Sequence, residues 1–213
     1  MKNLFALYPL LLLGFFLNAQ NLKSPDNNLD LNFSIDKDGR AFYSLNFHDE
    51  PVILNSGLGF MLKDNVEWMK IDTLDMMNNF KILNVTFDSV DEYWNPVWGE
   101  ESEIRNNYNE MFVELQQKES ERKVNIRFRL FDDSLGFRYE FPLQEKLGSF
   151  IIIDEKTEFA MAGDHTAMWI PGDYDTQEYN YTTPKLSEIE QKSIEFKEEN
   201  VSMYRFSNWA VQT

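Results

Sequence analysis

Aromatic rings and carboxylates are concentrated between Trp169 and Tyr181, where the chain reads WIPGDYDTQEYNY. The segment holds the rings of Trp169, Tyr174, Tyr179 and Tyr181 and the carboxylates of Asp173, Asp175 and Glu178. Pyranose C–H faces stack on aromatic rings, and carboxylate oxygens bind sugar hydroxyls or a hard cation such as calcium. These residue types therefore fit sugar recognition or a calcium site. A structural loop also fits, and composition alone favours it, because aromatic residues fill β-protein cores and acidic loop residues are usually solvated.

A second aromatic cluster, Tyr93–Glu100, reads YWNPVWGE and places two tryptophans beside Pro96 and Gly99. Proline and glycine interrupt regular structure, so we predict a loop that runs into Arg105–Glu110. Four rings from the two clusters are candidates for stacking on a substrate: Trp98, Trp169, Tyr174 and Tyr179. Packing in the core or at a domain interface is the competing interpretation of each ring.

Alternation of apolar and polar residues is the main structural signal that surrounds these clusters. Leu29–Ile35 alternates with the period of two that is typical of a half-buried strand. Asp36–Gly39 supplies turn residues before the alternation resumes, so Leu29–Phe47 is predicted to be a hairpin. Met111–Gln117 and Val124–Phe131 are predicted to pair antiparallel, with one packed face and one polar face.

Further strands are predicted along the rest of the chain. They are Phe60–Trp68, Met76–Asp91, Phe137–Phe141, Ile151–Ile153, Glu155–Met161 and Met203–Val211. Gln20–Asn28 is predicted to be a polar leader, and Leu186–Phe196 a short helix or an irregular segment. About ten strands, with turns roughly every eight to twelve residues, predict an all-β antiparallel sandwich. We expect this sandwich to be incomplete at its C-terminus, because the last predicted strand nearly reaches Thr213.

The N-terminus has the organisation of a secretory signal peptide. Lys2 provides the positive charge, Leu4–Leu17 is apolar, and Ala19 is the small residue after which we predict cleavage. The apolar run of about fourteen residues is short for a membrane span, and no cysteine follows that could carry a lipid. We therefore expect residues 1–19 to be removed and residues 20–213 to be secreted, into the periplasm or the medium, without a membrane anchor.

Charge and cysteine content exclude several classes of partner. The chain has 36 acidic and 20 basic residues and a formal charge of −16, which becomes −17 when the signal peptide with its one lysine is removed. Such a surface repels nucleic acid and anionic lipid, and leaves neutral ligands and divalent cations as partners. The chain has no cysteine, so disulfides do not stabilise it.

No catalytic motif is recognisable from the residues alone. The two histidines, His48 and His165, lie outside any nucleophile motif and lack the spacing of a zinc site. A glycosidase needs two carboxyl groups across a cleft, and the sequence does not select a pair among 36 acids.

Several motifs occur in a fixed order: Trp98–Glu100, Ile104–Glu110, Phe128–Asp133, Gly136–Pro142, Trp169–Gly172 and Glu178. In this order they resemble the N-terminal region of glycoside hydrolase family 97, over nearly all of the mature length. The resemblance implies a β-super-sandwich of the galactose-mutarotase type, followed in the family by a catalytic (β/α)8 barrel and a C-terminal β-domain. Enzymes of this family are typical of Bacteroidetes. They hydrolyse α-glucosides with inversion or α-galactosides with retention, and their active site holds calcium.

The resemblance implies a supporting role for this chain. The family's catalytic carboxylates lie on the barrel, and its N-terminal domain gives calcium one glutamate, from the loop that matches Gln177–Tyr179; this role falls to Glu178. Calcium takes about six to eight oxygens, so one carboxylate from this domain can help to hold a site shared with the barrel. We expect the 213-residue chain alone to have no activity on α-linked oligosaccharides and to bind calcium weakly. The choice between an α-glucosidase and an α-galactosidase stays open.

Two other interpretations also stay open. The chain could be an autonomous carbohydrate-binding module whose aromatic loops grip glucans. It could also be a purely structural periplasmic β-sandwich in which all of these rings belong to the core.

Overall fold

The predicted hairpin Leu29–Phe47 is present in the computed structural model, which describes residues 19–64, 73–170 and 179–198. Leu29 pairs with Phe47 and Ile35 with Ala41, so the hairpin is in antiparallel register along its whole length. Its apolar residues are buried and the residues between them are half-buried, as the alternation predicts. Gly39 closes the turn with φ 72°, and a Cβ atom there would lie 2.4 Å from the backbone nitrogen of Phe80. The turn therefore requires glycine for its conformation and for its close approach to the next sheet.

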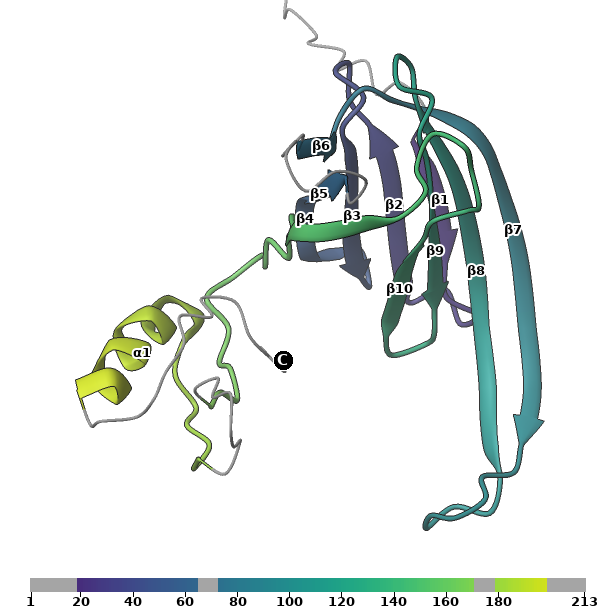
Figure 1. Cartoon of the computed structure of the whole chain (residues 1–213). Helices are drawn as coiled ribbons and strands as arrows, with labels where there is room; N and C mark the ends of the chain where they lie inside the picture. The colour runs from purple at the N-terminus through teal and green to yellow at the C-terminus, as the bar shows by residue number, and fades with distance from the viewer. Residues whose placement is uncertain (1–18, 65–72, 171–178, 199–213) are drawn as a thin grey trace, which may run out of the picture. The chain divides into compact units, whose positions relative to one another are not determined.

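Three antiparallel sheets make up the first of two compact units, Met1–Ala160 (Figure 1). The first sheet has the order β1-β2-β3-β4, with β1 Gln20–Lys23, β2 Leu29–Ile35, β3 Ala41–Phe47 and β4 Glu50–Leu58. The second has the order β10-β9-β8-β7, with β7 Phe80–Trp94, β8 Ile104–Gln117, β9 Lys123–Leu130 and β10 Leu135–Glu140. The third has the order β11-β5-β6, with β5 Phe60–Asp64, β6 Thr73–Met76 and β11 Phe150–Glu155.

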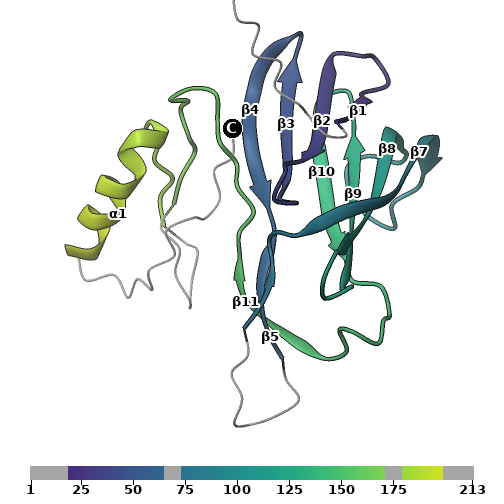
Figure 2. The same cartoon turned by 90° about the horizontal axis from the view of Figure 1, so that it is seen from above.

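The two four-stranded sheets pack face to face around an aromatic core (Figure 2). Phe33 of β2 lies 5.8 Å from Phe128 of β9, and Tyr43 of β3 lies 5.4 Å from Phe137 of β10, between ring centroids. Phe33, Tyr43 and Phe128 are fully buried. Burial of such rings provides most of the driving force for folding, so the inward positions of β2, β3, β9 and β10 fix how the two sheets pack.

The segment Phe150–Ala160 connects the first and third sheets. Its first part is β11, which pairs with β5. Beyond Glu155 it bonds to Gly59 and then to β4. The hydrogen bonds are Lys156 N to Gly59 O (2.9 Å), Glu158 N to Gly57 O (2.9 Å) and Leu54 N to Ala160 O (2.7 Å). The buried hydroxyl of Tyr43 also donates to the carbonyl of Glu158, at 2.8 Å. One stretch of chain therefore covers the outer edges of both β4 and β5.

The second unit, Met161–Thr213, contains little regular structure within its described residues. Two isolated antiparallel bridges, Thr166–Lys185 and Trp169–Thr182, precede a 3₁₀ helix, η1 Leu186–Glu188, and a helix, α1 Ile189–Glu198. These agree with the short helix predicted at Leu186–Phe196. No helix in the described part of the chain is long and apolar enough to cross a membrane.

The all-β antiparallel sandwich is confirmed, but several elements differ from those predicted. The predicted strand Met76–Asp91 is interrupted, because β6 ends at Met76 and β7 begins at Phe80. The predicted strand Glu155–Met161 is wrong: β11 ends at Glu155, and Lys156–Ala160 forms no regular strand although its backbone bonds to the β4 segment.

Gln20–Lys23, predicted as part of a polar leader, is strand β1, which pairs with β2 mainly through its backbone. The predicted loop Tyr93–Glu100 begins late, because β7 continues to Trp94 and β8 already starts at Ile104. Cross-strand pairing outweighs the weak strand propensity of the asparagine- and acid-rich residues there. The strand predicted at Met203–Val211 lies outside the described residues.

Candidate functional site

The acidic aromatic stretch Trp169–Tyr181 lies in a loop whose base is closed by paired backbone. Trp169 and Thr182 exchange two hydrogen bonds of 2.8 Å. The same ladder continues with Ala167 N to Pro184 O at 2.8 Å and Leu186 N to His165 O at 3.0 Å. Two chain segments that leave such a ladder are held side by side, so the ends of the loop have fixed positions relative to the second unit's own helices.

Asp164 fastens this ladder to the helical segment. Its carboxylate accepts hydrogen bonds from the backbone nitrogen and the hydroxyl of Ser187, both at 2.9 Å. The backbone hydrogen bond from Ser187 is the main reason why the pKa of Asp164 lies below its usual range. Asp164 is therefore ionised at neutral pH, and it ties the start of η1 to the strand-like segment before the loop.

The structure describes only part of the predicted site. Glu178, the predicted calcium ligand, and Tyr174, a predicted stacking residue, lie outside the described residues. Trp169 is 5% exposed, so the described structure presents little of its ring to a ligand, and Tyr179 is half-buried. The stacking roles of Trp169, Tyr174 and Tyr179 stay predictions, as does the role of Glu178.

Trp98, the fourth stacking candidate, lies at the end of a projecting arm. β9 pairs with β8 only from Asn109 onward, so Val90–Trp94 and Ile104–Tyr108 form a two-stranded ribbon that extends past the rest of the sheet (Figure 1). We call this ribbon, with its tip Asn95–Glu103, the arm. Val97 is 99% and Trp98 88% exposed. A planar ring so exposed is available to a ligand or a partner, whereas Trp169 is not.

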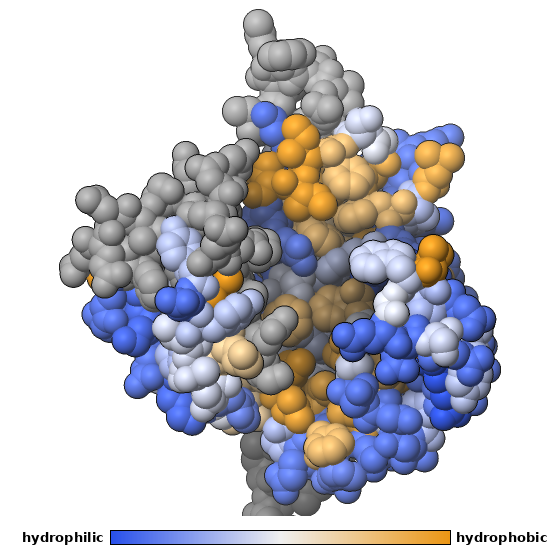
Figure 3. All heavy atoms as spheres, turned by 90° about the horizontal axis from the view of Figure 1, so that it is seen from below, coloured by the Kyte–Doolittle hydropathy of each residue, from blue (hydrophilic) through white to orange (hydrophobic). Residues whose placement is uncertain are grey.

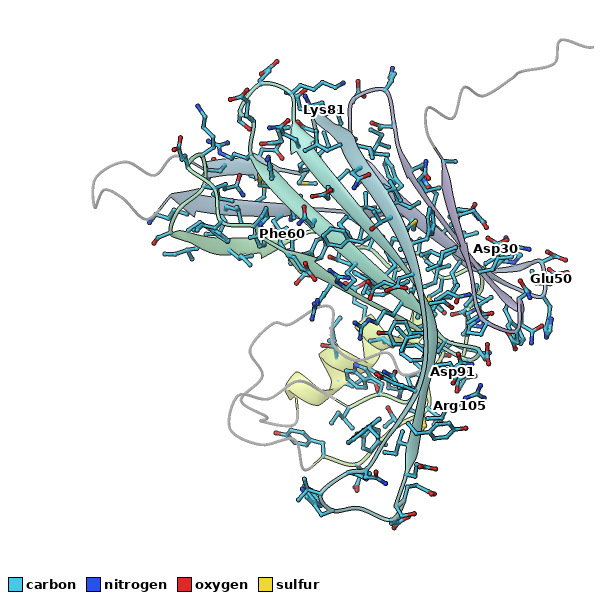
Figure 4. The ribbon with its side chains drawn as sticks, turned by 90° about the vertical axis from the view of Figure 1, so that its right-hand side faces the viewer. Asp30, Glu50, Phe60, Lys81, Asp91 and Arg105 are labelled. Carbon is cyan, nitrogen blue, oxygen red and sulfur yellow. The ribbon has the colours of Figure 1, made fainter. Side chains whose placement is uncertain are left out.

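The two faces of the arm differ in chemistry. On the face that continues the sandwich core, Asp91 and Arg105 form a bidentate ion pair, with Nε–Oδ1 and Nη2–Oδ2 distances of 2.7 and 2.8 Å (Figure 4). Hydrogen bonds from Arg105 lower the pKa of Asp91, and those to Asp91 raise the pKa of Arg105. On the opposite face, Asn106 donates to Glu92 at 3.0 Å. Both pairs are solvent-exposed, and they order side chains more than they stabilise the fold.

A larger ion-pair network lies on the polar face of the second sheet. Glu110, only 7% exposed, accepts hydrogen bonds from both Arg127 and Arg129. Each guanidinium also lies 4.4 Å above an aromatic ring, Arg127 over Phe112 and Arg129 over Tyr108.

Glu140 extends this network. It accepts from Arg127 at 2.7 Å and from Arg138 at 2.8 Å, and the bond from Arg127 is the largest cause of its lowered pKa. Every member of this network points away from the core, and each of its two glutamates is paired with two arginines. The network therefore supports the sheet from which the arm projects, and we assign it no chemistry.

Sequence reasoning selected Trp98 but missed the residues that face one side of the arm. These are Asp91, Tyr93 and Arg105 on the arm, with Phe87, Ser89 and Asn109 on the adjoining part of the same face. The available signal was the alternation of Phe87, Ser89, Asp91 and Tyr93, which shows a common face only if the strand is followed as far as Trp94. Figure 3 shows apolar residues among polar ones on the surface of the first unit.

The described residues contain no cluster of metal-binding side chains. Residues 19–64, 73–170 and 179–198 contain no group of three or more histidine, cysteine, aspartate or glutamate side chains that could hold an ion.

Comparison with known proteins agrees with the fold. Residues 22–206 match the family described as Glycosyl-hydrolase 97 N-terminal. A retaining alpha-galactosidase of Bacteroides thetaiotaomicron is 26% identical over 211 residues, which cover 92% of this chain and 29% of that protein.

Solved structures give the same result. A glycoside hydrolase family 97 enzyme of Pseudoalteromonas sp. strain K8, in complex with panose, is 34% identical with a TM-score of 0.68, over 78% of this chain and 24% of that one. A beta-arabinopyranosidase, 22% identical with a TM-score of 0.65, shares the fold. The chain thus spans about a quarter of the length of these relatives. It belongs to glycoside hydrolase family 97, and residues 22–206 form the N-terminal domain of that family.

Proposed function

We propose that this chain is the supporting domain of a secreted, calcium-dependent, exo-acting α-glycoside hydrolase and has no glycosidase activity alone. In this proposal Glu178 contributes one ligand to an active-site calcium, and a catalytic (β/α)8 barrel elsewhere in the full-length protein carries the reacting carboxylates. The observation that carries the proposal is family membership over residues 22–206 together with relatives roughly three times as long.

The ladder at Trp169–Thr182 supports the role of Glu178. Glu178 lies four residues before Thr182 in the sequence, and the backbone of Thr182 is fixed by two hydrogen bonds to Trp169. A ligand delivered close to a fixed ladder loses less conformational freedom on binding than one on a free segment. A carboxylate is also the donor that calcium prefers, and calcium would supply positive charge beside the scissile bond.

The substrate proposed is an α-linked oligosaccharide. The Pseudoalteromonas relatives have been solved with panose and with acarbose, and the Bacteroides relative is an alpha-galactosidase. A chain of formal charge −16 favours neutral ligands over anionic ones, which agrees with an uncharged sugar. Whether the sugar is an α-glucoside or an α-galactoside would be decided by the barrel.

Replacement of Glu178 by glutamine in a full-length enzyme carrying this domain tests the proposal. We expect at least a tenfold rise in the calcium concentration needed for half-maximal hydrolysis of an aryl α-glycoside, because one charged ligand of the shell is lost. Asp173→Asn, on the same loop, is the matched control and should leave the calcium requirement unchanged. Loss in Asp173→Asn with wild-type behaviour in Glu178→Gln would overturn the assignment, and turnover by the 213-residue chain alone would overturn its inactivity.

A second candidate function is an autonomous carbohydrate-binding module, and the 88% exposure of Trp98 favours it. An exposed tryptophan at the tip of a rigid hairpin can stack on a pyranose ring. Calorimetric titration of the chain with maltooligosaccharides separates the two functions. Tight binding that Trp98→Ala abolishes would support the module.

A further inference from the structure

One face of β7 and β8 carries a row of aromatic and polar side chains that the proposed calcium site does not use. We call it the arm strip: Phe87, Ser89, Asp91 and Tyr93 on β7, with Arg105 and Asn109 on β8. Cross-strand pairs Phe87–Met111, Ser89–Asn109 and Tyr93–Arg105 place these side chains on the same face. Met111, on this face, is fully buried in the core, so the arm strip is the outward continuation of the core side of the sheet.

Aromatic rings stand at both ends of the arm strip. Phe87 is 53% and Tyr93 60% exposed, although both follow the core-side alternation of β7. Their side chains are six residues apart, so the rings lie about 20 Å from each other along an extended strand. Large rings left half in water cost free energy unless a ligand covers them. The separation is far longer than one sugar ring, so a ligand that contacts both must be an oligomer.

The polar groups between the two rings are already ordered. Ser89 hydrogen-bonds to Asn109, and the amide of Asn109 donates to the backbone carbonyl of Lys23 at 2.8 Å. Asp91 and Arg105 hold each other through two hydrogen bonds, and Figure 4 shows them side by side on the arm. Side chains ordered before binding lose little entropy when a ligand arrives. They present carboxylate, amide and guanidinium groups, which bind hydroxyls.

A groove of about 580 Å³ lies at the inner end of the arm strip, between β1 and β7. It is lined by Asn21 and Lys23 on one side and by Phe87, Asp88 and Asn109 on the other. This volume falls within the range of small-molecule sites, about 300–1,000 Å³. A half-exposed phenyl ring and amide groups are present together there, which is a mixture suited to one end of a sugar chain.

We propose that the arm strip is a separate binding site for a neutral α-linked oligosaccharide, which stacks on Phe87 and Tyr93 and hydrogen-bonds to the groups between them. That the sugar is α-linked rests on the proposed function, whereas the position of the site rests on the residues of the arm strip. Binding here would hold a long substrate on the domain without using Glu178 or Trp98. The barrel of the proposed full-length protein, an extended peptide or a second copy of the chain would also cover the rings, but none of these needs the ordered row of hydroxyl-binding groups.

Calorimetric titration of the chain with maltotetraose in the presence of EDTA tests the site. Phe87→Ala and Tyr93→Ala should each weaken binding about five- to tenfold, since each removes one stacking contact. The double variant should show no measurable heat. Tyr93→Phe keeps the ring and should bind as the wild type does. Phe47→Ala, a similarly exposed ring on β3 outside the strip, is the matched control and should also bind normally.

Several results would overturn the site. They are absence of binding at millimolar maltotetraose, loss of binding in Trp98→Ala but not in the strip variants, or glucose binding as tightly as maltotetraose. A dimer in sedimentation velocity that Tyr93→Ala dissociates would assign the strip to self-association instead. Tyr93 lies on the two-stranded arm, so its variant should fold even if Phe87→Ala does not. The titration is made in EDTA and leaves Glu178 unchanged, so its result does not depend on calcium binding. The oligosaccharide site and the calcium role of Glu178 can therefore each be refuted without the other.

Discussion

Replacement of Glu110 by glutamine measures how much the ion-pair network stabilises the sandwich. Glu110 is 7% exposed and is the acceptor shared by Arg127 and Arg129. Glutamine preserves the size of the side chain but has a single oxygen and no charge. One of the two guanidinium groups then faces an amide NH₂, a donor, in place of an acceptor.

The expected loss is about 2–3 kcal/mol in the free energy of unfolding. One hydrogen bond between charged groups contributes about 1.5–3 kcal/mol. Removal of one partner from a buried ion pair costs about 3–5 kcal/mol, because the other charge stays buried and unpaired. Arg129 is 41% exposed at its side chain, so water can solvate it in the variant. The partial exposure therefore puts the loss at the lower end of these ranges.

Urea unfolding followed by circular dichroism measures the loss as a shift in the midpoint at constant slope. Glu114→Gln is the matched control, because Glu114 lies on the same strand and face, is half-buried, and pairs across the sheet with Asn125. It should change the unfolding free energy by less than about 0.5 kcal/mol. A loss below about 0.5 kcal/mol in Glu110→Gln, or equal losses in both variants, would show that the network does not stabilise the sheet.

Three further predictions concern other parts of the chain. Gly39→Ala should destabilise the sandwich by more than about 1 kcal/mol in urea unfolding, because alanine is strained at φ 72° and its Cβ would meet the backbone of Phe80. Gly136→Ala is the control, since the space around Gly136 is open. The pKa of Glu140 is lowered in the folded state, so the stability that Glu140 contributes is complete above its unfolded pKa of about 4.5 and is lost as the pH falls through the folded value. Glu140→Gln should therefore reduce the loss of unfolding free energy at acid pH. Curves of unfolding free energy against pH that run parallel in the variant and the wild type would contradict this. Asp164→Ala should speed amide hydrogen exchange in Leu186–Glu188 at least tenfold, because the bonds to Ser187 are lost, while exchange in β2 stays unchanged.

The sandwich could be predicted from the sequence because its strands alternate cleanly. Leu29–Phe47 and the pair Met111–Gln117 with Val124–Phe131 bury one face each, and their registers follow from that alternation. β1 could not be predicted in this way, since its four residues contain one buried side chain, Leu22, and its pairing depends on the backbone. Backbone hydrogen bonds leave no periodic pattern in the side chains.

The arm explains why the site was only partly foreseen. Trp98 could be selected because proline and glycine surround it, and the structure places it at the exposed tip. Phe87 lies in the predicted strand Met76–Asp91, where apolar residues on alternate positions normally face a core, whereas Tyr93 lies in the predicted loop Tyr93–Glu100. The sandwich ends before the strands do, so the same alternation points Tyr93 into solvent. A sequence pattern defines a face, but only the length of the neighbouring strands shows what covers it.

The bonding of Phe150–Ala160 to β4 has a consequence for the order of folding during synthesis. The backbone of Leu54 bonds to Ala160, and the hydroxyl of Tyr43 bonds to Glu158. These hydrogen bonds can form only after more than a hundred further residues have been synthesised. At about 5–20 residues per second, that delay is on the order of 5–20 s. During it the β2–β3 hairpin can form from local contacts, but the far edge of β4 keeps its unpaired N–H and C=O groups. A nascent chain shorter than 160 residues therefore exposes a strand edge open to aggregation, and a chaperone bound there would protect it until its own partner emerges.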